Sequence, residues 1–178
     1  MTGARDRALL LTGFAGALRR SELVSIDVDD LQQRDEGIVI MLHRSKTDQE
    51  GAGRRVALPY GHDHHTCPVT AIAEWQRAAG IAGGGLFRTI DRHSRVGDAL
   101  RPGAVNLIVK RAAVSAQLDP IVFSGHSLRA GFCTAAAAAG ATERAIANQT
   151  GHRSMNVLRG YIRIGSLFSD NAVAQLGL

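Results

Sequence analysis

The stretch SGHSLRAGF, residues 124–132, holds two side chains that could act together chemically. His126 can exchange a proton near neutral pH, Arg129 is a fixed cation, and a spacing of three puts both on one face of a helix. Alone, this pattern is more often an ordinary capped helix with incidental polar residues. Two later residues strengthen it, because His152 follows a helix-ending glycine and Tyr161 lies nine positions further on. Together these residues offer a hydroxyl nucleophile, proton-transfer groups and a cation for an anionic substrate.

The overall charge points in the same direction. The formal net charge is +5, the sequence pI is about 10.0, and all but Lys46 and Lys110 of the 21 basic residues are arginine. Arginine binds phosphate bidentately, so a polyanion, and nucleic acid first among polyanions, is the leading partner. A GC-rich coding sequence would produce the same arginine bias without functional meaning.

Length and composition favour one domain with its own core, since the chain has 178 residues of which 45% are hydrophobic. Cys67 and Cys133 are far apart and form no C-x-x-C motif, which indicates a reducing compartment, and we expect the cytoplasm. The apolar start of the chain is short and interrupted by Gly13 and Gly16, so we interpret it as a core helix, not a membrane span.

Hydrophobic periodicity and turn residues predict the elements that must position these side chains. Arg19 and Arg20 lie where one helix gives way to a second that opens at Ser21 and Glu22. The segments expected to be strands are 37–42 and 55–59, joined as a β-hairpin with a long polar tip. The segments expected to be helical are 8–15, 68–79, 103–116, 126–140, 142–149 and 154–163, and an amphipathic piece ends the chain. We expect an α+β fold, mostly helical, with a small antiparallel β-sheet.

Five strings in this order resemble the tyrosine recombinases, the phage-integrase family that includes Cre and the Xer enzymes. The strings are ALRRSEL (17–23), RSKTDQEGAGRRVALP (44–59), GHSLRAGF (125–132), TGHRS (150–154) and GYIR (160–163). The resemblance spans nearly the whole chain and implies the fold of that family's catalytic domain. The family's active-site set falls on Arg19, Lys46, His126, Arg129, His152 and Tyr161.

The resemblance also implies a role for each residue. Arg19 and Arg129 would stabilise charge on the non-bridging phosphate oxygens. A tyrosine hydroxyl has an ordinary pKa of about 10, so Tyr161 would need a proton acceptor, and His126 is the candidate. Lys46, on the hairpin tip, would protonate the departing 5′ oxygen.

Two further roles complete the implied site. His152 would donate a hydrogen bond to the scissile phosphate, and Glu22 would hold the active-site cations from behind. Attack by Tyr161 would give a 3′-phosphotyrosyl link that a 5′ hydroxyl reverses. The expected partner is double-stranded DNA. We expect no metal and no cofactor, since arginines supply the charge that Mg²⁺ supplies elsewhere.

Two related functions stay open at this point. A topoisomerase IB-like nicking and closing activity would use the same residues, whereas a non-catalytic DNA-binding remnant would share the fold and charge but keep Tyr161 away from the phosphate site. A third and more distant alternative is a metal-binding module built on HDHHTC (62–67), whose crowded His and Cys residues fit a solvated loop better than a standard zinc spacing. The acidic stretch IDVDDL (26–31) lacks the features of a calcium loop and is expected to be a turn.

The family usually carries a separate N-terminal helical domain that closes around DNA, and this chain begins almost at the first catalytic helix. We therefore expect residues 1–178 to form a single catalytic domain without the N-terminal core-binding domain, with weak DNA binding and little strand exchange by itself. The apolar residues of the last helix, Leu167, Phe168, Val173 and Leu176, could fold back onto the same domain or dock in another recombinase protomer on DNA.

Overall fold

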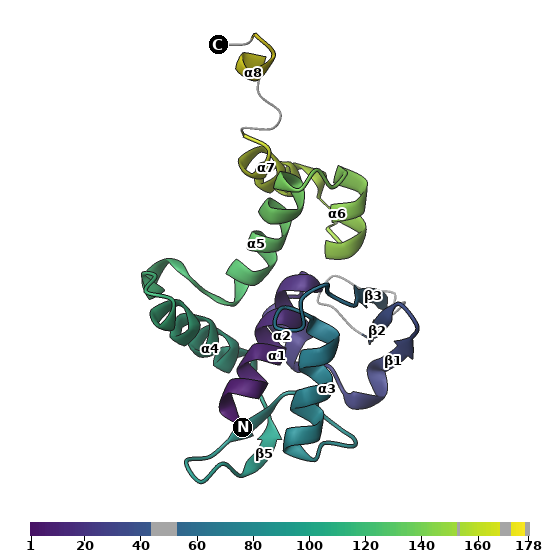
Figure 1. The fold of residues 1–178 in the computed structure, drawn as a ribbon, viewed down its shortest axis with the longest axis vertical. Coiled ribbons are helices and arrows are strands. Elements are labelled where there is room, and N and C mark those ends of the chain that lie inside the picture. Colours follow the sequence, from purple (N-terminus) through teal and green to yellow (C-terminus); the bar gives the residue numbers. More distant parts are fainter. Residues whose placement is uncertain (44–52, 153, 168–171, 177–178) are drawn as a thin grey trace.

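The computed structural model describes residues 1–43, 53–152, 154–167 and 172–176. Its fold is α+β and mostly helical with small antiparallel sheets, which confirms the expected class (Figure 1). The helices are α1 (Thr2–Ala15), α2 (Arg20–Val24), α3 (Pro68–Ala79), α4 (Pro102–Ser115), α5 (Gly125–Ala138), α6 (Glu143–Thr150), α7 (Met155–Gly165) and α8 (Ala172–Gln175). The strands are β1 (Leu31–Arg34), β2 (Gly37–Leu42), β3 (Arg54–Pro59), β4 (Arg88–Ile90) and β5 (Val96–Ala99), and the two 3₁₀ turns are η1 (Val28–Asp30) and η2 (Pro120–Val122).

The main core surrounds α1, which packs against α3 and α5. The chain leaves α1 through a tight turn in which Ala17 adopts a left-handed backbone with φ of 49°, an uncommon conformation for a residue with a side chain. The amide of Leu18 then bonds back to the carbonyl of Gly13 at 3.0 Å, and α2 begins at Arg20. This turn sets Arg19 immediately before α2, at the helix junction that the sequence predicted.

The predicted hairpin is confirmed as β2 and β3, which pair antiparallel from Gly37–Pro59 to Leu42–Arg54. Alternate residues of β3, Val56 and Leu58, are buried, as the period of a strand with one covered face requires. The sheet has a third strand, β1, that the sequence reading missed. The stretch 26–31 is therefore more than a turn, because it contains η1 and the start of β1.

Helix α3 matches its predicted bounds. Pro68 occupies the first turn and Gly80 ends the helix with a left-handed φ of 63°. Trp75 is fully buried and its indole N–H donates to the carbonyl of Leu86 at 2.8 Å. The glycine-rich segment after α3 leads into the β4–β5 hairpin, which the sequence reading also missed, because those strands are short and carry a register shift.

A second, smaller hydrophobic cluster joins α5, α6 and α7. Its buried residues are Cys133, Ala137, Ile146 and Leu158. In Figure 1 these three helices lie together above the main core, and α8 lies beyond them at the far end of the chain. Helix α5 contacts both parts, so side chains near its first turns lie where the two clusters meet.

The HDHHTC segment is exposed at its histidines and tied down by ion pairs. Glu74 of α3 contacts both Arg7 and His64, while Cys67 is buried at the start of α3. Within the described residues, no group of three or more His, Cys, Asp or Glu side chains is arranged to hold a metal ion.

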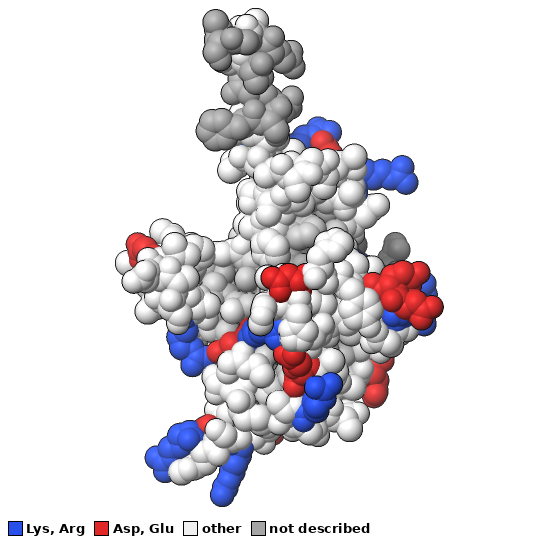
Figure 2. Space-filling view, viewed as in Figure 1, with Lys and Arg blue, Asp and Glu red and all other residues white. Residues whose placement is uncertain are grey.

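Charge is unevenly distributed over the face shown in Figure 2, where a group of acidic side chains lies on the side of β1 and β2 and basic ones are scattered over the face and its edges. Across the described part of the chain, no helix combines the length and apolarity needed to cross a membrane.

Candidate active site

The first turn of α5 is fixed by side-chain caps on both sides. The hydroxyl of Ser124 accepts from the amide of His126 at 3.3 Å, and the amide of Ser124 donates to the hydroxyl of Ser127 at 2.9 Å. The carbonyl oxygen of the Asn106 side chain, from α4, accepts from the amide of Gly125 at 2.8 Å. The beginning of α5 is therefore rigid, which gives His126 and Arg129 defined positions.

Arg129 is buried, with 2% of its surface exposed. One end nitrogen, Nη1, donates to the carbonyls of Ala17 at 2.7 Å and Thr150 at 2.6 Å. The other, Nη2, is buried and has no hydrogen-bond partner among the described residues. Burial and the nearby charge of Arg19 lower the pKa of Arg129 to about 10, so the guanidinium stays charged at neutral pH. Two backbone carbonyls thus hold a buried cation, and its second terminal nitrogen keeps a hydrogen-bond donor that no described residue uses.

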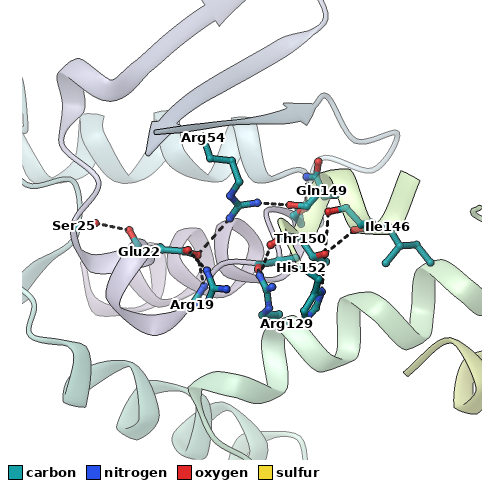
Figure 3. Close-up of polar contacts among 12 residues, drawn as sticks. Arg19, Glu22, Ser25, Arg54, Arg129, Ile146, Gln149, Thr150 and His152 are labelled. Atoms are coloured by element: carbon teal, nitrogen blue, oxygen red, sulfur yellow. Dashed lines mark hydrogen bonds and ion pairs between the residues drawn. The ribbon is translucent and has the colours of Figure 1, made fainter. Parts of the chain in front are cut away.

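Glu22 organises two further arginines. Its carboxylate is 2% exposed and accepts from the Arg19 amide at 2.8 Å and from the Arg19 guanidinium at 2.5 Å (Figure 3). The guanidinium of Arg54, from β3, lies 3.4 Å from the same carboxylate and donates to the carbonyl of Gln149 at 2.6 Å. Burial lowers the pKa of Arg54, partly offset by the attraction of Glu22. One carboxylate therefore connects the α2 junction, the sheet and the end of α6.

His152 lies just beyond α6 and follows Gly151, which ends that helix in a left-handed backbone conformation. Gly151 has a φ of 63°, and a Cβ at that position would lie 2.8 Å from Cδ of Arg54. The ring nitrogen Nδ1 of His152 lies 2.8 Å from the hydroxyl of Thr150. Burial, followed by the positive charge of Arg129, lowers the pKa of His152 to about 4, so the imidazole is neutral at neutral pH.

Tyr161 comes from α7 and reaches α5. Its hydroxyl lies 2.8 Å from Nε2 of His126, and its ring centre is 6.4 Å from that of His152. Tyr161 also packs against the α5–α7 hydrophobic cluster, which holds the ring while leaving the hydroxyl at the edge. The structure therefore gives the tyrosine a proton acceptor within hydrogen-bond reach.

A surface groove of about 570 Å³ runs along this edge of the molecule. Its lining residues are Arg19, Arg20, Ser21, Pro102, Asn106, Ser124 and His126. Of the predicted site residues, Arg19 and His126 line this groove. The contacts described above connect Glu22, Arg129, His152 and Tyr161 to them, so that six of the seven predicted site residues, counting Glu22, are brought together by elements far apart in sequence. The seventh, Lys46, lies outside the described residues, so its role stays a prediction.

Sequence reasoning missed Arg54, Thr150 and the carbonyl of Ala17. Arg54 stood inside a matched string but next to Arg55, and nothing in the pair shows that Arg54 is half-buried and Arg55 exposed. Thr150 directly precedes the Gly-His pair, which was its only signal. A backbone carbonyl leaves no trace in sequence.

The chain was compared with protein families and with known proteins. The family sequence model described as "Phage integrase family" matches residues 1–166. An integrase/recombinase xerD homolog from Selenomonas ruminantium is 42% identical over 99% of this chain and 52% of its own length. A tyrosine recombinase of Synechococcus elongatus is 35% identical over 89% of this chain and 47% of its own length. The chain therefore spans about half the length of the curated relatives it matches.

Solved structures show the same fold at low sequence identity. XerH bound to palindromic difH substrate in a post-cleavage complex has a TM-score of 0.69 at 19% identity, covering 98% of this chain and 45% of that one. XerA recombinase has a TM-score of 0.68 at 16% identity, with 99% and 55% coverage. A lambda integrase dimer bound to a COC′ core site has a TM-score of 0.61 at 16% identity, with 90% and 52% coverage.

Proposed function

Because the chain belongs to the phage integrase family, we propose that residues 1–178 act as one catalytic domain that cleaves and rejoins double-stranded DNA through a 3′-phosphotyrosyl intermediate. The observation that carries this proposal is the 2.8 Å contact between the Tyr161 hydroxyl and His126 Nε2. His126 lines a groove together with Arg19 and lies one helical turn before the buried Arg129. A nucleophile, a base and phosphate-binding cations are then within reach of one phosphate.

The proposed steps follow from these positions. His126 accepts the proton as the Tyr161 oxygen attacks phosphorus, and the 5′ oxygen leaves with a proton that we assign to Lys46. Arg129 Nη2 and the guanidinium of Arg19 bind the non-bridging oxygens as their charge grows. A 5′ hydroxyl then attacks the phosphotyrosine and gives its proton to Lys46, while His126 returns its proton to the departing Tyr161 oxygen. The covalent link conserves the bond energy, and the groups named supply the charge and protons for each step.

Glu22 supports this chemistry without touching the phosphate. Its bonds to Arg19 and Arg54 orient both guanidiniums. Its negative charge also offsets the mutual repulsion of Arg19, Arg54 and Arg129. The proposal keeps Glu22 as a positioning residue and adds Arg54 beside it.

The test is a covalent trap with nicked duplexes of randomised sequence, so that no target site need be known. Wild-type protein should give a protein-DNA adduct in the presence of a metal chelator. Tyr161→Phe should give none. The other tyrosine, Tyr60, is exposed and provides the matched control, so Tyr60→Phe should retain the adduct. An adduct that survives Tyr161→Phe, or is lost equally in Tyr60→Phe, would reject Tyr161 as the nucleophile.

Two further assays of the wild-type protein separate recombination from nicking and closing. A topoisomerase-like activity would relax supercoiled plasmid without exchanging strands between two labelled duplexes, whereas a recombinase domain joins strands from both. The 2.8 Å contact of Tyr161 argues against a non-catalytic remnant, whose tyrosine would lie away from the site.

We extend the proposal to assembly. Leu167, Val173 and Leu176 are exposed apolar residues near the C-terminal end, whereas Phe168 lies outside the described residues. An exposed apolar segment is stabilised when it is covered by protein. We assign its cover to a neighbouring protomer on DNA, by exchange of the C-terminal helix. The lambda integrase neighbour is a dimer on its core site, which supports assembly on DNA in this fold.

We also propose that the protein acts in the cytoplasm. Action on DNA, together with two buried free cysteines, favours this compartment.

A further inference from the structure

The hydroxyl of Thr150 contacts both backbone carbonyl oxygens of α6 and a ring nitrogen of His152. Thr150 ends α6 and is fully buried. Its Oγ1 lies 2.8 Å from the carbonyl of Ile146, 3.3 Å from that of Ala147 and 2.8 Å from Nδ1 of His152 (Figure 3). The hydroxyl therefore connects the helix backbone to the imidazole.

The number of available protons decides which group donates. A carbonyl oxygen only accepts, so two oxygens 2.8 Å apart need the threonine proton between them. A hydroxyl has one proton, and Thr150 therefore donates to the backbone of Ile146. The two lone pairs of its oxygen can only accept, and a hydrogen bond to His152 therefore requires a proton on Nδ1. The reverse orientation would leave two lone pairs facing each other in a buried place, which is costly.

A neutral imidazole with its proton on Nδ1 has a bare lone pair on Nε2. The charged and titratable groups that surround this ring are Arg129 and His126 from α5, Arg19 before α2, Arg54 from β3, and Tyr161 from α7, with Glu22 behind Arg19. The surrounding cations favour a lone pair over an added proton. Consistently, burial and Arg129 lower the pKa of His152 to about 4.

We infer that Thr150 is a positioning residue that holds His152 as the Nδ1–H tautomer, so that Nε2 is a proton acceptor in the unliganded site and takes up a proton from solvent when a tetrahedral oxyanion binds. This inference rests on the proposed function, because it takes the oxyanion to be a DNA phosphate. A phosphate oxygen and a bare Nε2 both present lone pairs and repel each other. Protonation converts Nε2 into a donor and brings a compensating positive charge.

The tautomer is measurable without DNA. In protein labelled with ¹⁵N at histidine, two-bond proton-nitrogen correlation spectra distinguish Nδ1–H from Nε2–H, and His152→Gln identifies the signals. Wild-type protein at neutral pH should show Nδ1–H. Thr150→Ser keeps the hydroxyl and should keep that pattern, whereas the isosteric Thr150→Val should lose it in favour of Nε2–H. An Nε2–H pattern in wild type, or an unchanged pattern in Thr150→Val, overturns the assignment.

The proton uptake is tested with inorganic sulfate, a tetrahedral anion that does not itself titrate near neutral pH. Sulfate should raise the pKa of His152 and move its Nε2 signal towards the protonated value. A His152 that does not respond to sulfate overturns the coupling. If the Arg129 Nε signal, followed in protein that is also labelled with ¹⁵N at arginine, still responds, the oxyanion site and the proposed function stand without the coupling. If neither residue responds, the oxyanion site of the proposed function is rejected as well. The tautomer of His152 is decided separately, by the spectra of the Thr150 variants.

Discussion

Replacing Glu22 by glutamine should destabilise the fold more than any loss of an exposed ion pair. Glu22 is 2% exposed and binds the Arg19 amide, the Arg19 guanidinium and Arg54. Removing one partner of a fully buried pair costs about 3–5 kcal/mol, because the other charge is left unpaired. The side chains of Arg19 and Arg54 are 34% and 22% exposed, so water screens them partly, and we expect a loss of about 2–3 kcal/mol.

The chain provides a matched control in Glu143, which pairs with Arg159 on the surface at 3.0 Å. Exposed pairs of this kind contribute about 0–1 kcal/mol. For a domain of this size, each kcal/mol shifts Tm by about 2–4 °C, so Glu22→Gln should lower Tm by about 4–12 °C and Glu143→Gln by a few degrees at most. Thermal and urea unfolding of both variants measure the difference. Equal losses in the two variants would refute the idea that Glu22 neutralises a buried cluster of arginines.

Two further outcomes follow from the same cluster. Arg54→Met should lower the free energy of unfolding in urea by about 1.5–3 kcal/mol, because the charged bonds of Arg54 to Glu22 and to the Gln149 carbonyl are lost. Arg55→Met, on the exposed face, should change it little. In the double variant with Glu22→Gln the two losses should fall short of additive by more than about 0.5 kcal/mol, and strict additivity would contradict the contact. The pKa of His152 is about 4 in the folded protein and 6.5 ordinarily, so the unfolded chain binds more protons between these pH values. The free energy of unfolding should therefore fall by about 1–3 kcal/mol as the pH drops through this range. If His152→Gln shows the same dependence of stability on pH, His152 is not its cause.

Much of the helical framework could be predicted from local chemistry. Helix α3 begins at a proline and ends at a left-handed glycine, and both signals are encoded in single residues. The short strands β1, β4 and β5 were missed because a three- or four-residue strand has too little alternation to be seen, and pairing with distant residues decides whether it forms. The β2–β3 hairpin was visible because its strands are longer and β-branched.

The candidate site divides in the same way. His126, Arg129, His152 and Tyr161 stood out because residue type and spacing carry their chemistry. Arg54 did not, because its importance comes from burial against Glu22 and the end of α6, which only the tertiary structure creates. Thr150 looked like an ordinary helix residue, since the orientation of one hydroxyl proton depends on a carbonyl four residues earlier and a ring two residues later.

The two carbonyls that hold Arg129 have a consequence for how such a site is inherited. The acceptors belong to Ala17 and Thr150, yet neither bond uses their side chains. Many substitutions at these positions would leave the acceptors in place, provided that the backbone follows the same path, including the left-handed turn at Ala17. A designer who transplants only the reactive side chains onto another scaffold would lose the anchor of the central arginine, because that anchor is a property of the path of the chain and not of any residue type.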